Sequence, residues 1–526
     1  MTVICHVSDE RFAALAGVDV EFDDGTDVVV LRSAPSGAVH GELAPGHYRV
    51  TLARDGYGAK RAVVQVAADG TADPAHLRLL TEAPSGYVWP KWTVAGGTGS
   101  VRVHSAEPYR LTLVRHGVEA QQVRLVGWFD EHGPRATVQV TPDGDYTQTG
   151  VGWAQHTAVT APGASGLYYF HLETESGAHF SFPWVVAPAV PASPIAVLAS
   201  TNSWLAYNNF GGRSNYINAT ALPPRPIVFA HTDLDRYRTG TSTEHQPADE
   251  HYRPLSFDRP EPLNQIGRDE RPGDPIRGRQ PCHLAAAEWR LLSWMEREGF
   301  DHDLYAEAQL HDGTLDLDRY RVLVISTHPE YWSREMYDAV YAWVHERGGK
   351  LMYLGGNGVD CEVEFLDPAT LRFLTQDEDP DGPDENRMHR THRPTSALLG
   401  VVFTHAGEGT SAPYRVVDAG HWVFAGTGLA DGDVFGTESL HERIPGGASG
   451  HETDKRAPDS PVSTHLLATG LNPDSGGGEI VHVRAERGGG EVFSVGSITW
   501  SAAVQVDKGV AAVTRNVLAR FLDEAP

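Results

Sequence analysis

Apolar and polar residues alternate in short segments over the first 190 residues of the chain. VDVEF, HYRVTL and AVVQVA are separated by Gly, Asp and Pro, and QQVRLVGWF and LYYFHLET continue the pattern. A period of two residues is typical of strands with one buried face, and Gly, Asp and Pro are typical of the turns between strands. The pattern predicts one β-sandwich over residues 1–85 and a second over residues 86–190.

The pattern changes after APAVPASP, a Pro- and Ala-rich segment that ends at Pro194 and is predicted to be a linker. IAVLAS, RVLVIS and KLMYLGG are short, continuous apolar runs, as expected of parallel strands buried on both faces. Apolar residues at helical spacing occur in HLAAAEWRLLSWMEREG and in the segment that begins at Ser333. We therefore expect residues 191–526 to form an α/β domain with a mostly parallel, doubly wound sheet of the flavodoxin- or amidotransferase-like kind.

Polar residues of functional type follow these apolar runs. Tyr207 and Tyr216 follow the first run, His328 and Glu330 follow the second, and Asn357 follows the third. Because ligands bind at the carboxyl ends of parallel strands, we expect these side chains to converge. The same positions carry no nucleophile elbow, dinucleotide-binding glycine motif or phosphate loop. Carboxylate, imidazole, amide and phenol groups indicate a metal site or a general acid and base pair.

The net charge and the cysteine content limit the kinds of ligand and metal site that the chain is expected to have. The 526 residues include 43 basic and 69 acidic ones, and the net charge of -26 disfavours nucleic acid, anionic membranes and polyanionic substrates. Cys5, Cys282 and Cys361 form no C-x-x-C pair, so neither a disulfide framework nor a thiolate zinc site is predicted. The N-terminus resembles no leader peptide, and no apolar run is long enough to span a membrane. We expect a cytoplasmic protein that binds small neutral or cationic ligands.

From about Ser193 onward the chain carries the motifs WLAYNNFGGRSNY, LSFDRP, AEWRLLSWMEREGFDHDLY, HPEYWS, YLGGNG, GHETD and VFSVGSITW. In this order, the motifs resemble the catalytic domain of the large (beta) subunit of N,N-dimethylformamidase. The first third of the chain does not visibly match that family, and residues 1–85 resemble small sandwiches of the transthyretin or carboxypeptidase-regulatory kind. The resemblance implies a separate small subunit as a partner, and the aromatic-rich sandwiches favour a homo-oligomer.

The resemblance also implies one ferric iron per chain, held by two tyrosinates and one carboxylate. These are hard oxygen donors, which favour a hard ion. Glu330 of HPE matches the carboxylate ligand, and Tyr207 of AYNNFGG matches one tyrosine. Tyr252 is the favoured match for the second tyrosine, because it precedes HPE by about the family's spacing, and Tyr216 is the alternative.

Three further residues match pocket positions of the family. Glu452 of GHETD matches an acidic proton shuttle, whereas His328 and Asn357 match residues that orient water or the developing oxyanion. The function implied is hydrolysis of a small, neutral, formamide-like amide. Two alternatives stay open: an iron hydrolase of another carbon–nitrogen bond, as in a urea, a carbamate or a larger amide, and a non-catalytic carbohydrate- or protein-binding β-sandwich protein with a degenerate α/β domain.

Overall fold

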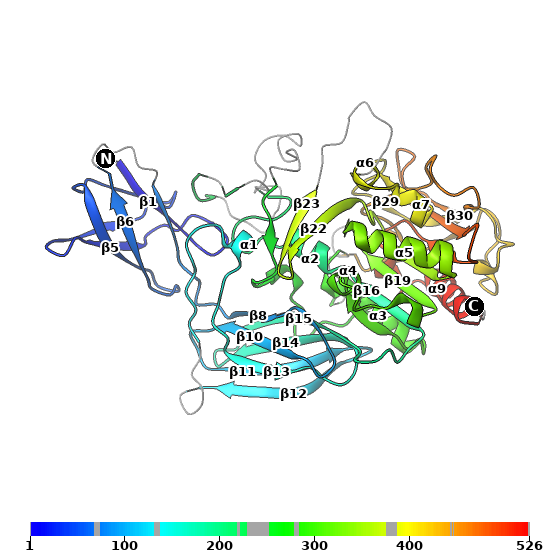
Figure 1. Ribbon diagram of the computed structural model, residues 1–526, viewed down its shortest axis with the longest axis horizontal. Helices are drawn as coiled ribbons and strands as arrows, with labels where there is room; N and C mark the ends of the chain where they lie inside the picture. The colour runs from blue at the N-terminus through cyan, green and yellow to red at the C-terminus, as the bar shows by residue number, and fades with distance from the viewer. Residues whose placement is uncertain are drawn as a thin grey trace.

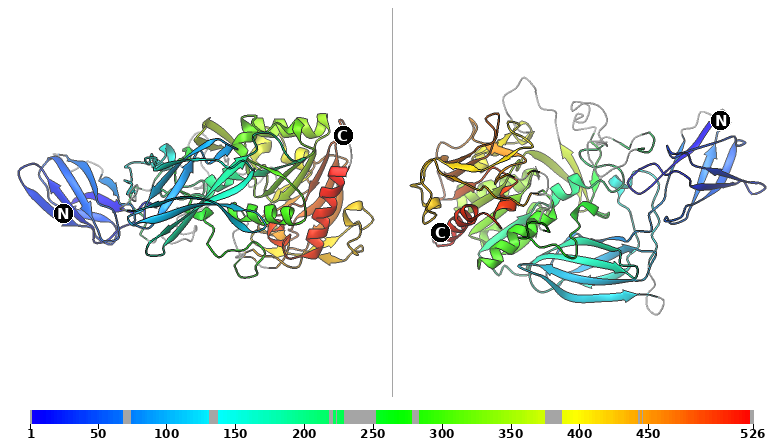
Figure 2. Two further views of the ribbon diagram at one scale, coloured as in Figure 1. Left: turned by 90° about the horizontal axis from the view of Figure 1, so that it is seen from below. Right: turned by 180° about the vertical axis from the view of Figure 1, so that it is seen from behind.

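The computed structural model of the chain describes residues 2–67, 74–130, 137–217, 221–222, 224–228, 252–277, 283–374, 387–441, 444 and 446–523. The N-terminal strands project from one end of the molecule, and the C-terminal helix lies at the opposite end (Figure 1). A second group of strands, formed by residues 85–187, lies beneath the C-terminal sheet in this view, and Figure 2 shows the same arrangement from below and from behind.

Two small sheets enclose a core at the N-terminus. One sheet has the strand order β4-β1-β7 and the other has the order β3-β2-β5-β6. Cys5 and Val7 from the first sheet pack against Val20, Tyr48 and Val50 from the second. The strands are β1 (Thr2–Ser8), β2 (Asp19–Asp23), β3 (Val28–Arg32), β4 (Ala38–Gly41), β5 (Gly46–Ala53), β6 (Lys60–Val66) and β7 (Ala75–Arg78).

A second pair of sheets follows, with strand orders β13-β10-β8 and β12-β11-β14-β15-β9. Val88 and Val101 on the smaller sheet pack against Leu111, Phe170 and Trp184 on the larger one. The elements are β8 (Ser85–Trp89), β9 (Trp92–Val94), β10 (Thr98–His104), β11 (Tyr109–His116), β12 (Ala120–Phe129), α1 (Tyr146–Thr149), β13 (Thr157–Thr160), β14 (Gly166–Thr174) and β15 (His179–Ala187). The predicted domain boundaries after residues 85 and 190 stay predictions.

The C-terminal part is built on a sheet with the strand order β18-β16-β19-β21-β32-β31-β30-β26-β27. Its strands are β16 (Ile195–Ala199), β18 (Asp303–Ala306), β19 (Val322–Thr327), β21 (Lys350–Gly355), β26 (Tyr414–Val416), β27 (Val434–Phe435), β30 (His465–Gly470), β31 (Glu479–Arg484) and β32 (Glu491–Ser494). Strands β18 to β32 in this order pair in parallel, whereas the pairs from β32 to β27 are antiparallel.

Helices cover both faces of the parallel half of the sheet. Apolar residues of α3 (Ala285–Arg297) and α9 (Lys508–Asp523) pack with Val197 and Val324 on one face. Apolar residues of α5 (Arg334–Arg347) and α7 (Thr395–Leu399) pack with Leu198 and Ile325 on the other. Neighbouring positions of one strand therefore face opposite layers, which explains why IAVLAS and RVLVIS are apolar throughout.

Short elements cover the ends of this sheet. A four-stranded sheet has the order β17-β23-β22-β20, and two further pairs are β24 with β29 and β25 with β28. These strands are β17 (Leu255–Ser256), β20 (Tyr331–Trp332), β22 (Cys361–Asp367), β23 (Thr370–Leu374), β24 (Val402–Thr404), β25 (Ser411–Ala412), β28 (Ser449–Gly450) and β29 (Thr453–Lys455). The remaining helices are α2 (Thr201–Tyr207), α4 (Glu307–His311), α6 (Arg387–Thr391), α8 (Trp500–Ala503) and the 3-10 turns Pro262–Asn264, Leu317–Arg319 and Trp422–Phe424.

The predicted mostly parallel, doubly wound α/β fold is wrong. The described chain is mainly β-structure, with two pairs of sheets ahead of a mixed C-terminal sheet in which the pairings from β32 to β27 are antiparallel. The physical reason lies in the connections: β31 and β32 are separated only by the Gly-rich segment 485–490, which is too short for a helical crossover. Throughout the described ranges, no helix is long and apolar enough to cross a membrane.

Candidate functional site

Polar residues that follow three parallel strands lie at one end of the C-terminal sheet. Tyr207 is the last residue of α2, which starts directly after β16. His328 and Glu330 follow β19, whose last residue, Thr327, takes a left-handed backbone conformation with φ 63°. Asn357 lies two residues beyond β21 and also has a positive φ, 48°. Left-handed backbone at non-glycine residues is uncommon and often occurs at functional sites, because the surrounding structure must enforce it.

His328 lies at the centre of this group and is fully buried. Its Nδ1–H donates to the carbonyl oxygen of Gly356 at 3.1 Å, which directs Nε2 toward the other side chains. Nε2 lies 2.9 Å from a Glu330 carboxylate oxygen, 3.3 Å from the Tyr207 hydroxyl and 3.7 Å from a Glu452 carboxylate oxygen. Burial lowers the pKa of His328, but the two carboxylates outweigh burial and raise it to about 9. The imidazole is therefore held as a cation at neutral pH.

Glu452 and Asn357 form a second contact within the group. The Asn357 side-chain amide donates to Glu452 Oε2 at 2.8 Å, and its backbone N–H donates to Asp454 at 2.8 Å. Burial raises the pKa of Glu452 to about 7. The Asn357 Oδ1 atom is buried and has no hydrogen-bond partner among the described residues. Because a buried, unpaired carbonyl is costly, this oxygen is suited to accept a hydrogen bond from a bound molecule.

The tyrosines surround Glu330 on the side of its Oε2 atom. The Tyr216 hydroxyl donates to Oε2 at 2.8 Å and also hydrogen-bonds to the Tyr331 hydroxyl. The rings of Tyr207 and Tyr216 stack with centroids 4.4 Å apart. Burial raises the pKa of both phenols well above the ordinary value. Tyr252 is buried, with 4% exposure, and lies three residues before β17.

Glu330 also takes part in a second cluster on the side of its Oε1 atom. The Cys361 thiol lies 3.6 Å from Glu330 Oε1 and 3.6 Å from an Asp360 oxygen. The potential ligand atoms of Glu330, Asp360 and Cys361 all lie within 4.8 Å of one another. This buried group could hold a metal ion. Phenol and carboxylate oxygens on the other side of Glu330 form a harder donor set than one that includes a thiol.

The structure adds residues that the sequence motifs did not single out. The ring of His283 lies tilted against that of Tyr207, with centroids 4.4 Å apart, and edge-on to that of His451 at 5.5 Å. His441 and His451 are joined through ring nitrogens 3.0 Å apart. His451 directly precedes Glu452 in GHETD, and that adjacency was the available signal. Of the cysteines, Cys282 lies outside the described residues, whereas Cys361 is buried beside Glu330.

The fold and site together define a mainly β, multi-part protein with a buried cluster of phenol, carboxyl and imidazole groups at the end of a mixed sheet. The family described as "N,N-dimethylformamidase beta subunit-like, C-terminal" matches residues 110–512. The chain belongs to this family. The predicted resemblance is therefore confirmed, and its match extends into the second pair of sheets, upstream of the predicted start near Ser193.

Two curated relatives carry the name N,N-dimethylformamidase beta subunit. The protein from Paracoccus aminophilus is 26% identical over 434 residues, which are 71% of this chain and 55% of that protein. The protein from Alcaligenes sp is 26% identical over 435 residues, with the same shares. The chain thus spans about half the length of the curated relatives it matches.

Similarity to solved structures is limited to parts of the chain. A β-galactosidase from Rahnella sp. R3 covers 63% of this chain and 31% of its own, with 11% identity and a TM-score of 0.30. A β-galactosidase from Bacillus circulans sp. alkalophilus covers 44% of this chain and 26% of its own, with 12% identity and a TM-score of 0.27.

Proposed function

We propose that the chain hydrolyses the carbon–nitrogen bond of a small, uncharged amide with the help of one ferric ion. The observation that carries the proposal is the contact of Tyr207, Glu330 and Glu452 with a single buried imidazole, that of His328. Membership of the dimethylformamidase beta subunit family supports amide hydrolysis as the reaction. The donor set was inferred from the same family resemblance, and the contacts of Tyr207, Glu330 and Glu452 with His328 add support from the structure.

The proposed iron ligands are Tyr207, Glu330 and a second tyrosine. Phenolate and carboxylate oxygens suit a hard trivalent ion, and the raised pKa of both Tyr207 and Tyr216 means that such an ion must bind for these phenols to ionise at neutral pH. Spacing along the sequence favours Tyr252 as the second tyrosine. The 2.8 Å contact with Glu330 favours Tyr216, so the two remain competing assignments. When bound, the ion supplies a Lewis acid that polarises a carbonyl and lowers the pKa of water.

Glu452 is the proposed proton carrier. A carboxyl group with a pKa of about 7 can both accept and release a proton near neutral pH. As the oxygen of water bonds to the substrate carbonyl carbon, Glu452 accepts the proton of that water. It then gives the proton to the nitrogen as the carbon–nitrogen bond breaks, and the products are a carboxylic acid and an amine. The side chain retains 15% exposure, which allows exchange with solvent.

His328 and Asn357 are the proposed orienting groups. The cationic imidazole of His328 fixes the two carboxylates and stabilises negative charge that develops on the carbonyl oxygen. Asn357 positions Glu452 through its amide N–H, and its unpaired Oδ1 can accept a hydrogen bond from water or from the departing amine. Neutral substrates fit a site that already holds the buried carboxyl groups of Glu330 and Asp454 and the half-buried one of Glu452.

The test combines iron analysis with a hydrolysis panel. Protein produced with ample iron is assayed for iron per chain and for amine release from N,N-dimethylformamide, formamide, acetamide, a urea and a carbamate. We expect about one iron per chain and turnover of at least one formamide-like amide. Turnover of only the urea or the carbamate would assign a different carbon–nitrogen bond, and iron-free protein without turnover would favour the binding-protein alternative.

The carboxylate ligand is tested by Glu330→Ala and by the isosteric Glu330→Gln, which is included in case the alanine variant fails to fold. Both variants are expected to lose the iron and, with it, amide turnover. The matched control is Glu335→Gln, an exposed position on α5. Full iron content in a folded Glu330→Gln protein would rule out Glu330 as a ligand.

We also propose a cytoplasmic protein that self-associates and works with a separate small subunit. The support is that the curated relatives are named beta subunits. Light scattering on the purified chain, alone and with a co-produced candidate subunit, measures both associations. A chain that stays monomeric and retains full turnover alone would contradict both parts.

A further inference from the structure

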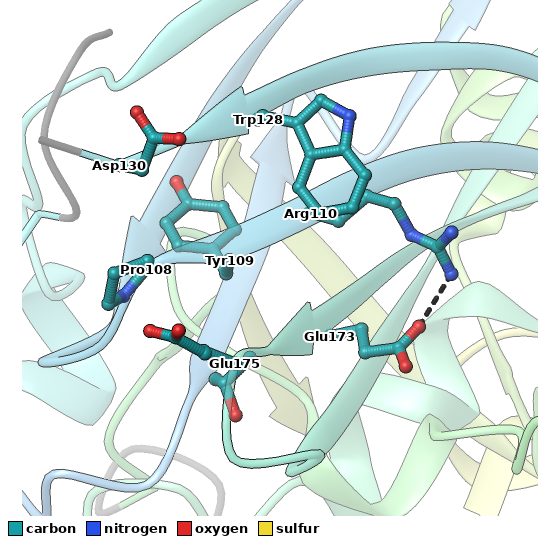
Figure 3. Close-up of a pocket in the computed structure, with 8 residues that line it drawn as sticks. Pro108, Tyr109, Arg110, Trp128, Asp130, Glu173 and Glu175 are labelled. Carbon is teal, nitrogen blue, oxygen red and sulfur yellow. Dashed lines mark hydrogen bonds and ion pairs between the residues drawn. The ribbon is translucent and has the colours of Figure 1, made fainter. Parts of the chain in front are cut away.

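A cavity opens on the surface of the second pair of sheets, and none of the described residues that line it belongs to the candidate active site (Figure 3). Its volume is about 600 Å³, within the range of small-molecule sites. Residues at the start of β11, at the end of β12 and in the turn after β14 line it: Pro108, Tyr109, Arg110, Trp128, Asp130, Glu173, Thr174 and Glu175. In Figure 3, Trp128 and Asp130 lie on one side, Glu173 and Glu175 lie on the other, and the Tyr109 ring lies between them.

One wall of the cavity is an exposed aromatic ring that already contacts a cation. The indole of Trp128 is 60% exposed, and the Arg110 guanidinium lies over it at 5.6 Å from the ring centroid. Arg110 is ion-paired with Glu173 at 2.6 Å. The π-face of an indole attracts positive charge and also packs well against carbon–hydrogen groups. An organic cation that carries alkyl groups could therefore pack favourably on the Trp128 indole.

The remaining polar groups are mainly acceptors with negative charge. Among the described residues of the lining, Asp130, Glu173 and Glu175 supply three carboxylates and Arg110 supplies one guanidinium. Glu173 is ion-paired both with Arg110 and with Arg268, so the attraction for a cation comes mainly from Asp130 and Glu175. The net charge of the whole chain, -26, adds to the attraction of positive ligands. Anionic ligands are disfavoured by the same charges.

The Tyr109 hydroxyl provides a second, independent indication that the cavity binds a ligand. The side chain is 2% exposed, its ring stacks on Phe129 with centroids 4.9 Å apart, and its hydroxyl has no hydrogen-bond partner within the described ranges. A buried hydroxyl without a partner costs stability. A bound molecule with a polar group could supply the missing hydrogen bond.

From these observations we propose that the cavity binds a small organic cation of the alkylammonium class. Its carbon groups pack on the Trp128 indole, its charge faces Asp130 and Glu175, and a polar substituent hydrogen-bonds to Tyr109. A neutral sugar would also stack on the indole and could donate hydroxyl hydrogen bonds to the carboxylates, but it would lack the charge attraction that a cation gains from them. This assignment is independent of the proposed amide hydrolysis.

Calorimetric titration of the full chain tests the charge requirement. The probes are choline, its neutral isostere 3,3-dimethylbutan-1-ol, and glucose. We expect choline to bind about tenfold more tightly than the isostere, since a cation–π contact and carboxylates favour only the charged probe, and to weaken as salt rises. Equal affinity for choline and the isostere, glucose binding without choline binding, or no choline binding would each overturn the proposal.

Variants locate the binding. Trp128→Ala and Glu175→Gln are expected to weaken choline binding about tenfold, and both positions are exposed, so folding is preserved. Tyr109→Phe is expected to weaken choline binding while raising the melting temperature of the ligand-free protein, because the unpaired hydroxyl is removed. Glu82→Gln, an exposed position outside the cavity, is the control. Choline affinity that is unchanged in both Trp128→Ala and Glu175→Gln would place the binding elsewhere.

Discussion

The carboxyl group of Glu330 faces different atoms with each of its oxygens. Oε2 contacts the Tyr216 hydroxyl and His328, whereas Oε1 faces the Cys361 thiol. A cation on the Oε2 side would meet phenol oxygens, which hard ions prefer. A cation on the Oε1 side would meet a sulfur and the Asp360 carboxylate, which a softer ion prefers. The identity of a metal bound at the proposed site would therefore report which side of Glu330 it occupies.

The visible absorption spectrum of the iron-loaded protein distinguishes the candidate tyrosine ligands. Ferric ion bound to phenolate gives a visible charge-transfer band, so Tyr207→Phe is expected to weaken that band. Tyr216→Phe and Tyr252→Phe are compared in the same way. Only the variant that removes the second ligand should weaken the band. Absorption spectra at equal iron content make the comparison, and Tyr341→Phe serves as a control on α5. A spectrum that is the same in all of these variants would exclude Tyr207, Tyr216 and Tyr252 as ligands.

Glu452→Gln tests the proton carrier apart from the metal. The amide side chain cannot accept the proton of water, so turnover is expected to fall by about 10²- to 10⁴-fold. Iron content and melting temperature should stay near those of the unchanged protein, because Glu452 is not a proposed ligand. Steady-state amine release measures the effect. Turnover within a few-fold of the unchanged protein would assign the proton transfer to another group.

At the scale of single elements, local sequence signals were accurate. The runs IAVLAS, RVLVIS and KLMYLGG form β16, β19 and β21. The helix predicted to begin at Ser333 is α5, where Ser333 accepts a hydrogen bond from Met336 N–H and Gly348 takes the left-handed C-cap, with φ 83°. These features depend on residues close in sequence, which is why they could be predicted.

The apolar runs did not show whether neighbouring strands pair in parallel or antiparallel. EIVHVR and EVFS are apolar runs similar to RVLVIS, yet β31 and β32 pair antiparallel. Direction is set by the connection, and the segment 485–490 between these two strands is short enough only for a hairpin, which the predicted fold did not include. The candidate site shows a similar limit: His328, Glu330 and Asn357 follow regular strands, but the path of the coil after Tyr207 decides whether Tyr216 reaches Glu330.

Helix α3 supports the strand ends through Glu288. Its carboxylate accepts hydrogen bonds from the Ser200 backbone N–H and the Thr327 hydroxyl, each at 3.0 Å. Burial raises the pKa of Glu288 from 4.5 to about 7, so the folded state favours the protonated form. The stability from this group is fully present below pH 4.5 and is lost as pH rises through about 7. The shift corresponds to on the order of 3 kcal/mol.

Glu288→Gln should therefore flatten this part of the stability profile. Gln stays neutral and can still accept from Ser200 and Thr327 through its carbonyl oxygen. The variant is expected to gain stability relative to the unchanged protein as pH rises from 4.5 to 7. Chemical denaturation at several pH values measures the difference, with exposed Glu42→Gln as the control. Parallel profiles for Glu288→Gln and the unchanged protein would contradict the pKa shift.

At the scale of the whole molecule, a line of histidines lies where the second pair of sheets meets α3. The ring nitrogens of His116 and His171 lie 3.2 Å apart, and those of His171 and His179 lie 3.0 Å apart. The ring of His116 packs edge-on against Trp289 of α3. Burial lowers the pKa of His171 to about 3, and His179 and Arg268 add to the effect. These imidazoles are therefore neutral in the folded protein at neutral pH.

Acid should weaken this contact between the parts of the molecule. A histidine whose pKa is lowered on folding contributes stability that is fully present above its ordinary pKa of 6.5 and is lost as pH falls toward 3. His171→Gln keeps hydrogen-bonding capacity without titrating. Between pH 6.5 and pH 4, its melting temperature is expected to fall by a few degrees less than that of the unchanged protein, with exposed His47→Gln as the control. If the melting temperatures of His171→Gln and the unchanged protein fell equally with pH, His171 would not take up a proton on unfolding.

The order of strands in the C-terminal sheet has a consequence for synthesis of the chain. Tyr207 and Glu330 leave the ribosome long before Glu452, and β21 pairs with β32, which begins only at Glu491. A nascent chain thus carries the proposed metal ligands for more than a hundred residues of translation before its proton carrier and the neighbour of β21 exist. Loading of the proposed metal into a complete site would therefore follow synthesis of the C-terminal strands, and chains truncated before β32 are predicted substrates for proteolysis.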